Sequence, residues 1–440
     1  MASGAPAPRM KAVNPREEFL TRELHPPLTA EQALLEADRC LGCGGAHAEA
    51  PCAAACPADV DVPGFIGALA VGDPLGAART ILAENLLGGT CARVCPVEVL
   101  CEGACVLHDE GRKPIAIGSL QRYAMDVAFA GEEAELRRIA PPRPGRVVVV
   151  GAGPAGLACA GELAALGHEV TIYEWHEEIG GLVRYAIAPY REQREPLPAE
   201  QRLLERMGVE FRLGTAAPPE ELAGAGAVFL GVGLGPDVPV RYPGDELGGV
   251  WDSLPFIEAL KTGAPPRVGR DVVVVGGGNT AMDVAREAVR LGAERVTVLY
   301  RRTRALMPAY AHEVDEAEAE GVRFEWLTEP VRFLGTQRVA AVECRSMRLG
   351  EPDESGRRRP EPVPGSEFVL DADTVVKALG QRPRPEYVKL LQGVDAATGR
   401  TSDPKIFAGG DMLNGGQSAV EAVREGKLAA AAIHEFLCPA

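Results

Sequence analysis

The sequence lacks the features of a membrane, secreted or nucleic-acid-binding protein. None of its apolar runs is long enough to span a bilayer. Its start, MASGAPAPRMKAVNPREEF, has no apolar core of the kind found in signal peptides. The formal charge of −16 provides no basic excess for binding nucleic acid. We therefore expect a cytoplasmic protein with no membrane span and no nucleic-acid partner.

Aromatic residues are also scarce, at 5% of the chain, so the core has to be built mainly from Ala, Val and Leu. A chain of 440 residues is too long for one hydrophobic core and indicates two or three domains. The hydrophobic and charged fractions are those of ordinary folded proteins, which argues against widespread disorder.

Cysteine, in contrast, is plentiful: eight of the eleven cysteines lie between Cys40 and Cys105. They read C-x2-C-x8-C-x3-C-P and then C-x3-C-P-x4-C-x3-C. A reducing compartment does not favour disulfides, so this crowding predicts a metal site. Short spacing with Cys-Pro steps is typical of [4Fe–4S] ligands, and a zinc site of four thiolates is the alternative. We expect the other three cysteines, Cys159, Cys344 and Cys438, to be small buried hydrophobes or terminal bystanders.

A strand–glycine–helix–strand pattern occurs twice, over residues 146–174 and 271–302. In the first copy, glycines follow four valines and open a helix, and an acidic residue ends the next strand. These are the elements of a dinucleotide fingerprint, in which the glycines let the backbone approach a pyrophosphate and the acid binds a ribose hydroxyl. The predicted binding residues here are Gly151, Gly153, Pro154, Ala155, Gly156 and Glu174.

The second copy differs at the end of its second strand, where Arg301 and Arg302 replace the acidic residue. Two guanidinium groups there suit a 2′-phosphate, so NADPH is favoured as the bound nucleotide, with NADH as the alternative. The plainer alternative is a solvated surface pair of arginines. The other binding residues predicted in this copy are Gly276, Gly278, Asn279 and Thr280, with Ala281 at the third fingerprint position.

Four segments together resemble the flavoprotein reductases with two dinucleotide domains: GAGPAG, GGLVRYAI, GGGNTAMDVA and IFAGGD. The resemblance implies FAD at the first site and NAD(P)H at the second, which is inserted in the chain. It also implies further FAD contacts, with the last three of the following residues near the isoalloxazine ring: Gly181, Leu182, Arg184, Gly380, Gly410, Asp411, Gln417, Ser418 and Ala419. Neither nucleotide domain has a CxxC pair, so dithiol exchange as in thioredoxin reductase is not expected.

The cysteine-rich head carries RCLGC, CARVCP, CEGAC and IGSLQRY. It resembles the head of the glutamate synthase small subunit and the N-terminal part of dihydropyrimidine dehydrogenase. In two-cluster ferredoxins the Cys of the Cys-Pro step ligates the other cluster, which would move Cys56 to the second block. The resemblance then implies two [4Fe–4S] clusters, one held by Cys56, Cys95, Cys101 and Cys105 and the other by Cys40, Cys43, Cys52 and Gln121.

Two neighbours of these ligands are expected to stay outside the clusters. Cys91 is predicted to be a nearby non-ligand, although it is the alternative to Gln121 as fourth partner. His47 lies in an insertion, GGAHAE, that lengthens the gap after Cys43, and we expect it to face solvent.

The predicted fold is α/β, with a helical double-cluster domain followed by two Rossmann-like domains. The expected bounds are 1–140 for the head, 141–255 and 372–440 for the FAD domain, and 256–371 for the inserted NAD(P)H domain. PPRPG at 141–145 is the expected linker, because its prolines stop helices. A polar loop is expected over 350–367 and a closing helix over 418–437.

The predicted activity is hydride transfer from NAD(P)H to FAD, followed by electron transfer through the clusters. This needs no acid–base residue, so none is assigned, and His168, His312 and Glu313 are interpreted as surface or positioning groups. No substrate-reducing domain is present, which predicts a partner: a glutamate synthase large subunit, a dihydropyrimidine dehydrogenase catalytic subunit, or ferredoxin. A non-catalytic assembly or sensor subunit is the alternative from another class.

Overall fold

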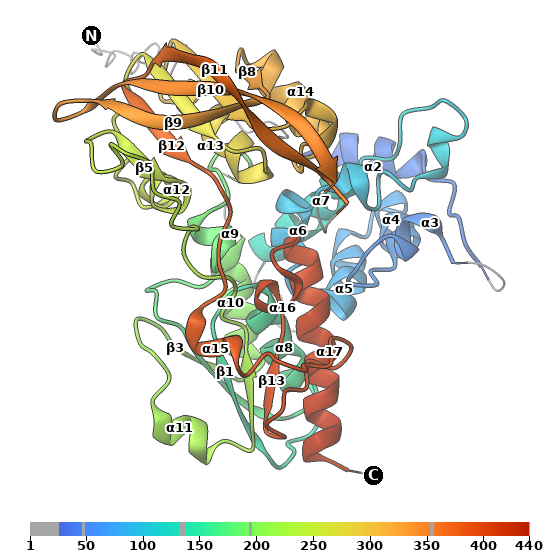
Figure 1. Cartoon of the computed structure of the whole chain (residues 1–440). Coiled ribbons are helices and arrows are strands. Elements are labelled where there is room, and N and C mark those ends of the chain that lie inside the picture. The colour runs from blue at the N-terminus through green and yellow to red at the C-terminus, as the bar shows by residue number, and fades with distance from the viewer. Residues whose placement is uncertain (1–25, 46–48, 132–136, 193–195, 353–355, 440) are drawn as a thin grey trace, which may run out of the picture.

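The computed structural model describes residues 26–45, 49–131, 137–192, 196–352 and 356–439, so His47 lies outside the described part. Three regions are visible in Figure 1: a helical head, a lower region that contains β1 (Arg146–Val150), and an upper region that contains β12 (Thr374–Lys377). Within the described ranges, no helix combines the length and the apolar character needed to cross a membrane.

The head is built from short helices and two 3₁₀ turns, as predicted. Three of its helices begin at side-chain caps: Thr29 forms a capping box with Gln32, while Asp61 and Asp73 accept hydrogen bonds from the backbone N–H groups of the third helical residues. The elements are α2 (Ala30–Asp38), α3 (Pro51–Ala54), α4 (Val62–Ala70), α5 (Pro74–Glu84), α6 (Gly88–Val94), η1 (Val97–Val99), η2 (Val106–His108) and α7 (Ile117–Ala130).

The lower region holds a parallel five-stranded sheet in the order β13-β4-β1-β2-β3. Its other strands are β2 (Glu169–Tyr173), β3 (Val209–Arg212), β4 (Ala227–Leu230) and β13 (Ile406–Ala408). The long helix α17 (Ala419–Leu437) confirms the predicted closing helix and packs along α8 (Pro154–Ala165) (Figure 1). The remaining helices are α9 (Leu182–Tyr185), α10 (Leu197–Arg206), α11 (Pro219–Gly224), α15 (Pro385–Val388) and α16 (Asp411–Asn414).

The upper region holds a second parallel sheet, in the order β5-β12-β6-β7-β8. Its other strands are β5 (Val250–Asp252), β6 (Asp271–Val275), β7 (Arg295–Tyr300) and β8 (Arg323–Trp326), and its helices are α12 (Ser253–Lys261), α13 (Asn279–Arg290), η3 (Arg304–Leu306) and α14 (Ala311–Ala319). The predicted boundaries leave β5 and β12 in the first nucleotide domain, whereas both strands pair within this second sheet. The chain therefore crosses between the sheets before β5 and after β12.

The other face of the second sheet is covered by three antiparallel strands, β9 (Thr328–Gly335), β10 (Val339–Pro352) and β11 (Arg358–Asp371). The polar loop predicted over 350–367 is wrong, because most of it belongs to the paired strands β10 and β11. Three prolines, Pro360, Pro362 and Pro364, lie within β11. They are tolerated because β11 is an edge strand, where a missing N–H donor costs little.

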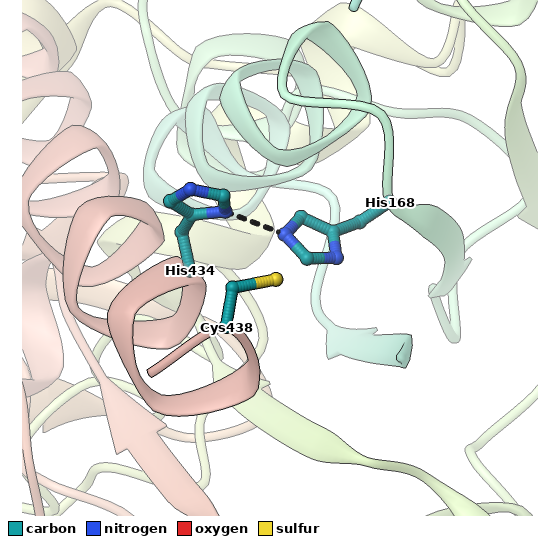
Figure 2. Close-up of side chains that lie close together, drawn as sticks. All are labelled: His168, His434 and Cys438. Atoms are coloured by element: carbon teal, nitrogen blue, oxygen red, sulfur yellow. Dashed lines mark hydrogen bonds between the residues drawn. The ribbon is translucent and has the colours of Figure 1, made fainter. Parts of the chain in front are cut away.

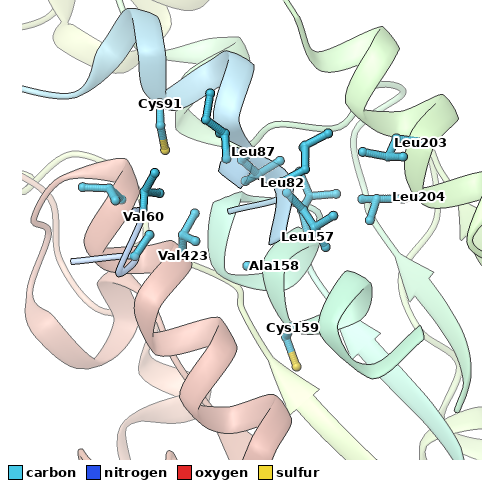
Figure 3. Close-up of a cluster of buried hydrophobic side chains, with 14 of the residues drawn as sticks. Val60, Leu82, Leu87, Cys91, Leu157, Ala158, Cys159, Leu203, Leu204 and Val423 are labelled. Atoms are coloured by element: carbon cyan, nitrogen blue, oxygen red, sulfur yellow. The ribbon is translucent and has the colours of Figure 1, made fainter. Parts of the chain in front are cut away.

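The head and the first nucleotide domain share one hydrophobic core. Leu82 and Leu87 of the head pack in the same cluster as Leu157 of α8, Leu204 of α10 and Val423 of α17 (Figure 3). The second sheet has its own cores, one on each face. Because burial of apolar surface is the main stabilising term, the head is fixed to the first domain rather than loosely linked to it.

Glu200 of α10 also ties the head to this domain. Its carboxylate accepts hydrogen bonds from the Thr90 backbone N–H (2.8 Å) and from Thr90 Oγ1 (2.6 Å). Burial raises the pKa of Glu200 to about 7, although the bonds from Thr90 oppose this shift. The folded state therefore binds a proton more tightly than the unfolded chain, and its stability falls as pH rises from the unfolded pKa of about 4.3 through 7.

We expect Glu200→Gln to remove part of this pH dependence, since glutamine keeps an oxygen for the Thr90 N–H but cannot ionise. Between pH 5 and 8, the wild-type chain should lose up to about 3 kcal/mol more unfolding free energy than the variant. Urea or thermal unfolding at several pH values measures this difference. Glu205→Gln, on the exposed face of the same helix, is the matched control. Equal slopes for wild type and Glu200→Gln would contradict the prediction.

Candidate functional site

A cavity of about 1230 Å³ lies where the head, the first sheet and the second sheet meet. Its lining includes the N-terminus of α13 and head residues around Cys95. The predicted site residues that it brings together are Gly151, Gly153, Pro154, Ala155, Glu174, Gly181, Leu182, Asn279, Thr280, Gly410, Asp411, Gln417, Ser418 and Ala419. One continuous space therefore reaches from both fingerprints to the cysteine-rich head.

The positions of the fingerprint need glycine for different structural reasons. Gly151 has a φ of +102°, and a Cβ on Gly156 would lie 1.9 Å from the Gly151 carbonyl oxygen, so these positions are fixed by the turn and by packing. Gly153 and Gly278 differ, because a Cβ there would meet no atom closer than 4.0 Å. Each caps the N-terminus of a 12-residue helix, α8 or α13, in extended backbone. Space is left beside both helix ends, as a bound pyrophosphate requires.

The buried carboxylate of Glu174 and the half-buried carboxylate of Asp411 flank the first fingerprint. Glu174 accepts from the backbone N–H groups of Ala152 (2.8 Å) and His176 (2.9 Å), which fixes it at the end of β2. Asp411 begins α16, and burial raises its pKa to about 6, partly offset by a hydrogen bond from the backbone of Gln417. Both carboxylates line the cavity, so the arrangement fits a ribose at Glu174 and the ribityl–phosphate chain of FAD at Asp411.

Several other predicted residues lie outside the cavity lining. Gly156 packs under the turn. Arg184 forms an ion pair with Glu178 (2.8 Å) and donates to the carbonyl of Lys261. Gly276 packs against the Ala378 carbonyl, and Gly380 accepts from the backbone N–H of Val238.

The two arginines after β7 are placed differently from each other. Arg301 is exposed, whereas Arg302 is only 6% exposed and donates from Nε to the carbonyl of Arg358 (3.1 Å). Of the pair, Arg301 is the one presented to solvent at the strand end.

Sequence reasoning missed a polar cluster that joins the two nucleotide domains. The Tyr190 hydroxyl donates to Asp283 (2.8 Å), and Arg191 forms ion pairs with Asp283 (2.7 Å) and Glu313. His312, beside Glu313, lies 3.5 Å from Glu98 of the head. The contacts cross domain boundaries and have no local motif, so the sequence carries no signal for them.

The cysteines form two groups, and their membership corrects the prediction. Cys105 lies with Cys40, Cys43 and Cys52 around one small pocket. Electrostatic interactions link the second group, Cys56, Cys91, Cys95 and Cys101. The expected grouping of Cys105 with Cys56, Cys95 and Cys101 is therefore wrong. A tight turn between Cys101 and Cys105, closed by the hydrogen bond from the Cys105 N–H to the Glu102 carbonyl, directs the two thiols to different groups.

Gln121 does not complete the first group, whose fourth position Cys105 occupies. Its Nε2 donates to the Gly88 carbonyl (2.8 Å) at the start of α6, the helix that carries Cys91 and ends at Cys95. Cys91 and Gln121 are thus both placed on the side of the second group.

The spacing of the thiols fits clusters better than zinc. Among the residues described, no three of the head's sulfurs lie within 4.8 Å of one another. Four thiolates on one zinc ion would be about 3.8 Å apart, whereas each thiolate of a [4Fe–4S] cluster binds a different iron and stands farther from the others. Burial raises the pKa of Cys40 and Cys56, and that of Cys52 to about 11, so the thiolates need the charge of bound iron.

Comparison with known families agrees with this geometry. Residues 145–426 match the family model described as pyridine nucleotide-disulphide oxidoreductase. The chain belongs to this family. Residues 16–133 match the model of dihydropyrimidine dehydrogenase domain II, 4Fe-4S cluster. The predicted resemblance, the α/β fold class and the oxidoreductase class are confirmed.

Relatives of this pyridine nucleotide-disulphide oxidoreductase match over most of its length. It is 37% identical to the glutamate synthase [NADPH] small chain of Halomonas elongata, over 94% of this chain and 93% of that protein. It is 40% identical to the NADPH-Fe(3+) oxidoreductase subunit beta of Geobacter sulfurreducens, over 83% of this chain and 56% of that protein. A structure of Mycobacterium tuberculosis FprA with NADPH shares the fold, with a TM-score of 0.58 and 20% identity over 67% of this chain and 85% of FprA.

Proposed function

We propose that this chain is the electron-input component of a larger oxidoreductase: it oxidises NADPH and passes electrons through FAD and two [4Fe–4S] clusters to a partner. The observation that carries the proposal is the single cavity shared by both fingerprints and the Cys95 segment. Bound FAD would supply the conversion of a two-electron hydride donor into a source of single electrons. The proposal is tested with anaerobic, cluster-loaded protein. NADPH should bleach the flavin absorbance, and EPR should then detect the reduced clusters. No bleaching would overturn it and favour the non-catalytic assembly or sensor subunit.

The chain's own residues would bind and orient the cofactors. The open backbone at Gly153, the start of α8 and the carboxylates of Glu174 and Asp411 would hold FAD. Gly278 and the start of α13 would hold the pyrophosphate of NADPH. Asn279 stabilises this end by accepting a hydrogen bond from the backbone N–H of Tyr310 (3.0 Å), which also lines the cavity. No residue is assigned to acid–base catalysis.

Arg301 is proposed to bind the 2′-phosphate, because Arg302 already donates to a backbone carbonyl. We expect Arg301→Ala to lower kcat/KM for NADPH by about 10- to 100-fold, the loss expected for one hydrogen bond to a charged group. The value for NADH should stay nearly constant. Arg323→Ala, an exposed arginine on neighbouring β8, is the control. An equal loss with both nucleotides would show that Arg301 acts on something other than the phosphate.

The two cysteine groups have different positions on the proposed path. Cys95 lines the cavity, so the cluster of the second group would receive electrons first. The cysteines of the first group do not line the cavity, and they lie next to Leu41, which is 54% exposed. We propose that electrons leave the chain there. In the second group the fourth ligand would be Cys91 or Gln121.

The partner is proposed from the names of the relatives, which are a small chain and a subunit beta. A glutamate synthase large subunit is favoured; a dihydropyrimidine dehydrogenase catalytic subunit and ferredoxin are the alternatives. A cytoplasmic, reducing location suits the free cysteines of the head. Mass spectrometry of what co-purifies with the chain from its native host distinguishes these partners.

A further inference from the structure

Two histidines and a cysteine that are far apart in the sequence meet at the end of α17. His168 lies in the turn between α8 and β2, His434 lies in the last turn of α17, and Cys438 follows that helix (Figure 2). His168 Nε2 and His434 Nδ1 are 2.8 Å apart, and one ring nitrogen of each histidine lies within 4.8 Å of Cys438 Sγ. Among described residues, no other three His, Cys, Asp or Glu side chains bring their ligand atoms this close.

Rigid elements hold the three donors in place. The His168 side is fixed by the backbone hydrogen bond from its N–H to the Leu163 carbonyl (3.0 Å) and by Gly167, where a Cβ would lie 2.2 Å from the Pro141 carbonyl oxygen. The His434 side is fixed because α17 packs along α8. His168 was expected to be a surface or positioning group; at 5% exposed it is not a surface group. A metal site needs this kind of support from packed elements.

The placement of the His168 ring suits a metal ligand. His168 Nδ1 is buried and has no hydrogen-bond partner among the described atoms. The other ring nitrogen, Nε2, faces His434 Nδ1 (Figure 2).

A hydrogen bond between two neutral imidazoles explains the 2.8 Å contact but gives no role to the thiol of Cys438. Two imidazoles and a thiolate are ligands that zinc prefers, and a tetrahedral ion would separate the nitrogens by about 3.3 Å. We propose that His168, His434 and Cys438 form a zinc site whose fourth position is open to water. Zinc would displace the thiol proton to solvent and move the ring proton of His434 to Nε2. It would tie the end of α17 to the α8–β2 turn.

None of the three side chains lines the dinucleotide cavity, so loss of the site should leave NADPH-driven dye reduction unchanged. The full chain, loaded with FAD and iron and given one equivalent of Zn²⁺ without oxygen, is measured by zinc-edge X-ray absorption. It should show three nitrogen or oxygen neighbours at about 2.0–2.1 Å, from two imidazoles and one water, and one sulfur at about 2.3 Å. Iron measured in parallel should not change.

His434→Gln and Cys438→Ser should each weaken zinc binding at least about tenfold in competition with a chromophoric chelator. Zn²⁺ should raise the thermal midpoint of the wild-type chain but not of Cys438→Ser. Glu435→Gln, an exposed carboxylate on the same helix, should bind zinc like wild type. Cys438 lies after the last helix, so its variant tests the site without disturbing the core. An all-sulfur zinc environment, or unchanged affinity in both ligand variants, would overturn the proposal.

Discussion

Gly278→Val is expected to lower NADPH oxidation at least about 100-fold while FAD stays bound. The backbone at Gly278 is extended, with a φ of −92°, and no atom lies within 4 Å of a Cβ there, so the folded chain accepts valine. The added side chain would fill the space in which the backbone of a fingerprint approaches a pyrophosphate. Stopped-flow reduction by NADPH measures the loss. Dithionite should still reduce the flavin of the variant to the same extent as in the wild-type protein.

Gly153→Val is the matched variant at the first fingerprint. Its position has the same extended backbone and the same open space, with the nearest atom, the Cα of Gly181, 4.0 Å from a Cβ. It should purify without FAD but fold normally. If Gly278→Val lost FAD and Gly153→Val kept it, the assignment of the two cofactors to the two sites would be reversed.

Cys105→Ala is expected to remove one cluster and leave the other. Because Cys105 lies with Cys40, Cys43 and Cys52, the iron content should fall from about eight to about four per chain. NADPH should still bleach the flavin, since the second group lies closer to the cavity. Reduction of the protein partner should be lost, because the proposed exit is gone. Iron analysis, EPR and a partner-reduction assay measure these three effects.

Two variants accompany this test. Cys159→Ala changes a cysteine buried in the shared core but outside both groups, and it should keep all the iron. Cys91→Ala decides the fourth ligand of the second group: a loss of about four irons selects Cys91, and no loss selects Gln121. Full iron content in Cys105→Ala would contradict the grouping seen in the structure.

The parts of the molecule that sequence predicts well are those encoded by local patterns. Valine runs, glycine turns and caps located β1, β6, α8, α13 and α17. Spacing along the chain also identified the cysteines, because ligands of one head must lie close in sequence. Spacing assigned Cys105 to the wrong cysteine group. A single turn decides to which side its thiol points, and no spacing rule describes that turn.

Contacts between distant segments were beyond the reach of local patterns. The pairing of β5 and β12 with the second sheet depends on which strands become neighbours. The bonds of Arg191 to Asp283 and Glu313 depend on how two domains meet. His168 and His434 are separated by most of the chain and share no motif. Each of these features is fixed by tertiary packing, which overrides the local sequence signal.

The shared core has a consequence for how the chain is made. The head is encoded first, but its docking surface includes Val423 of α17, and Lys427 of the same helix donates to the carbonyl of Ala58 (2.7 Å). That surface is complete only after the ribosome has delivered α17. α8 and α10 supply the rest of that surface earlier, through Leu157 and Leu204. The head therefore reaches its final packing in two stages, first against α8 and α10 and last against α17.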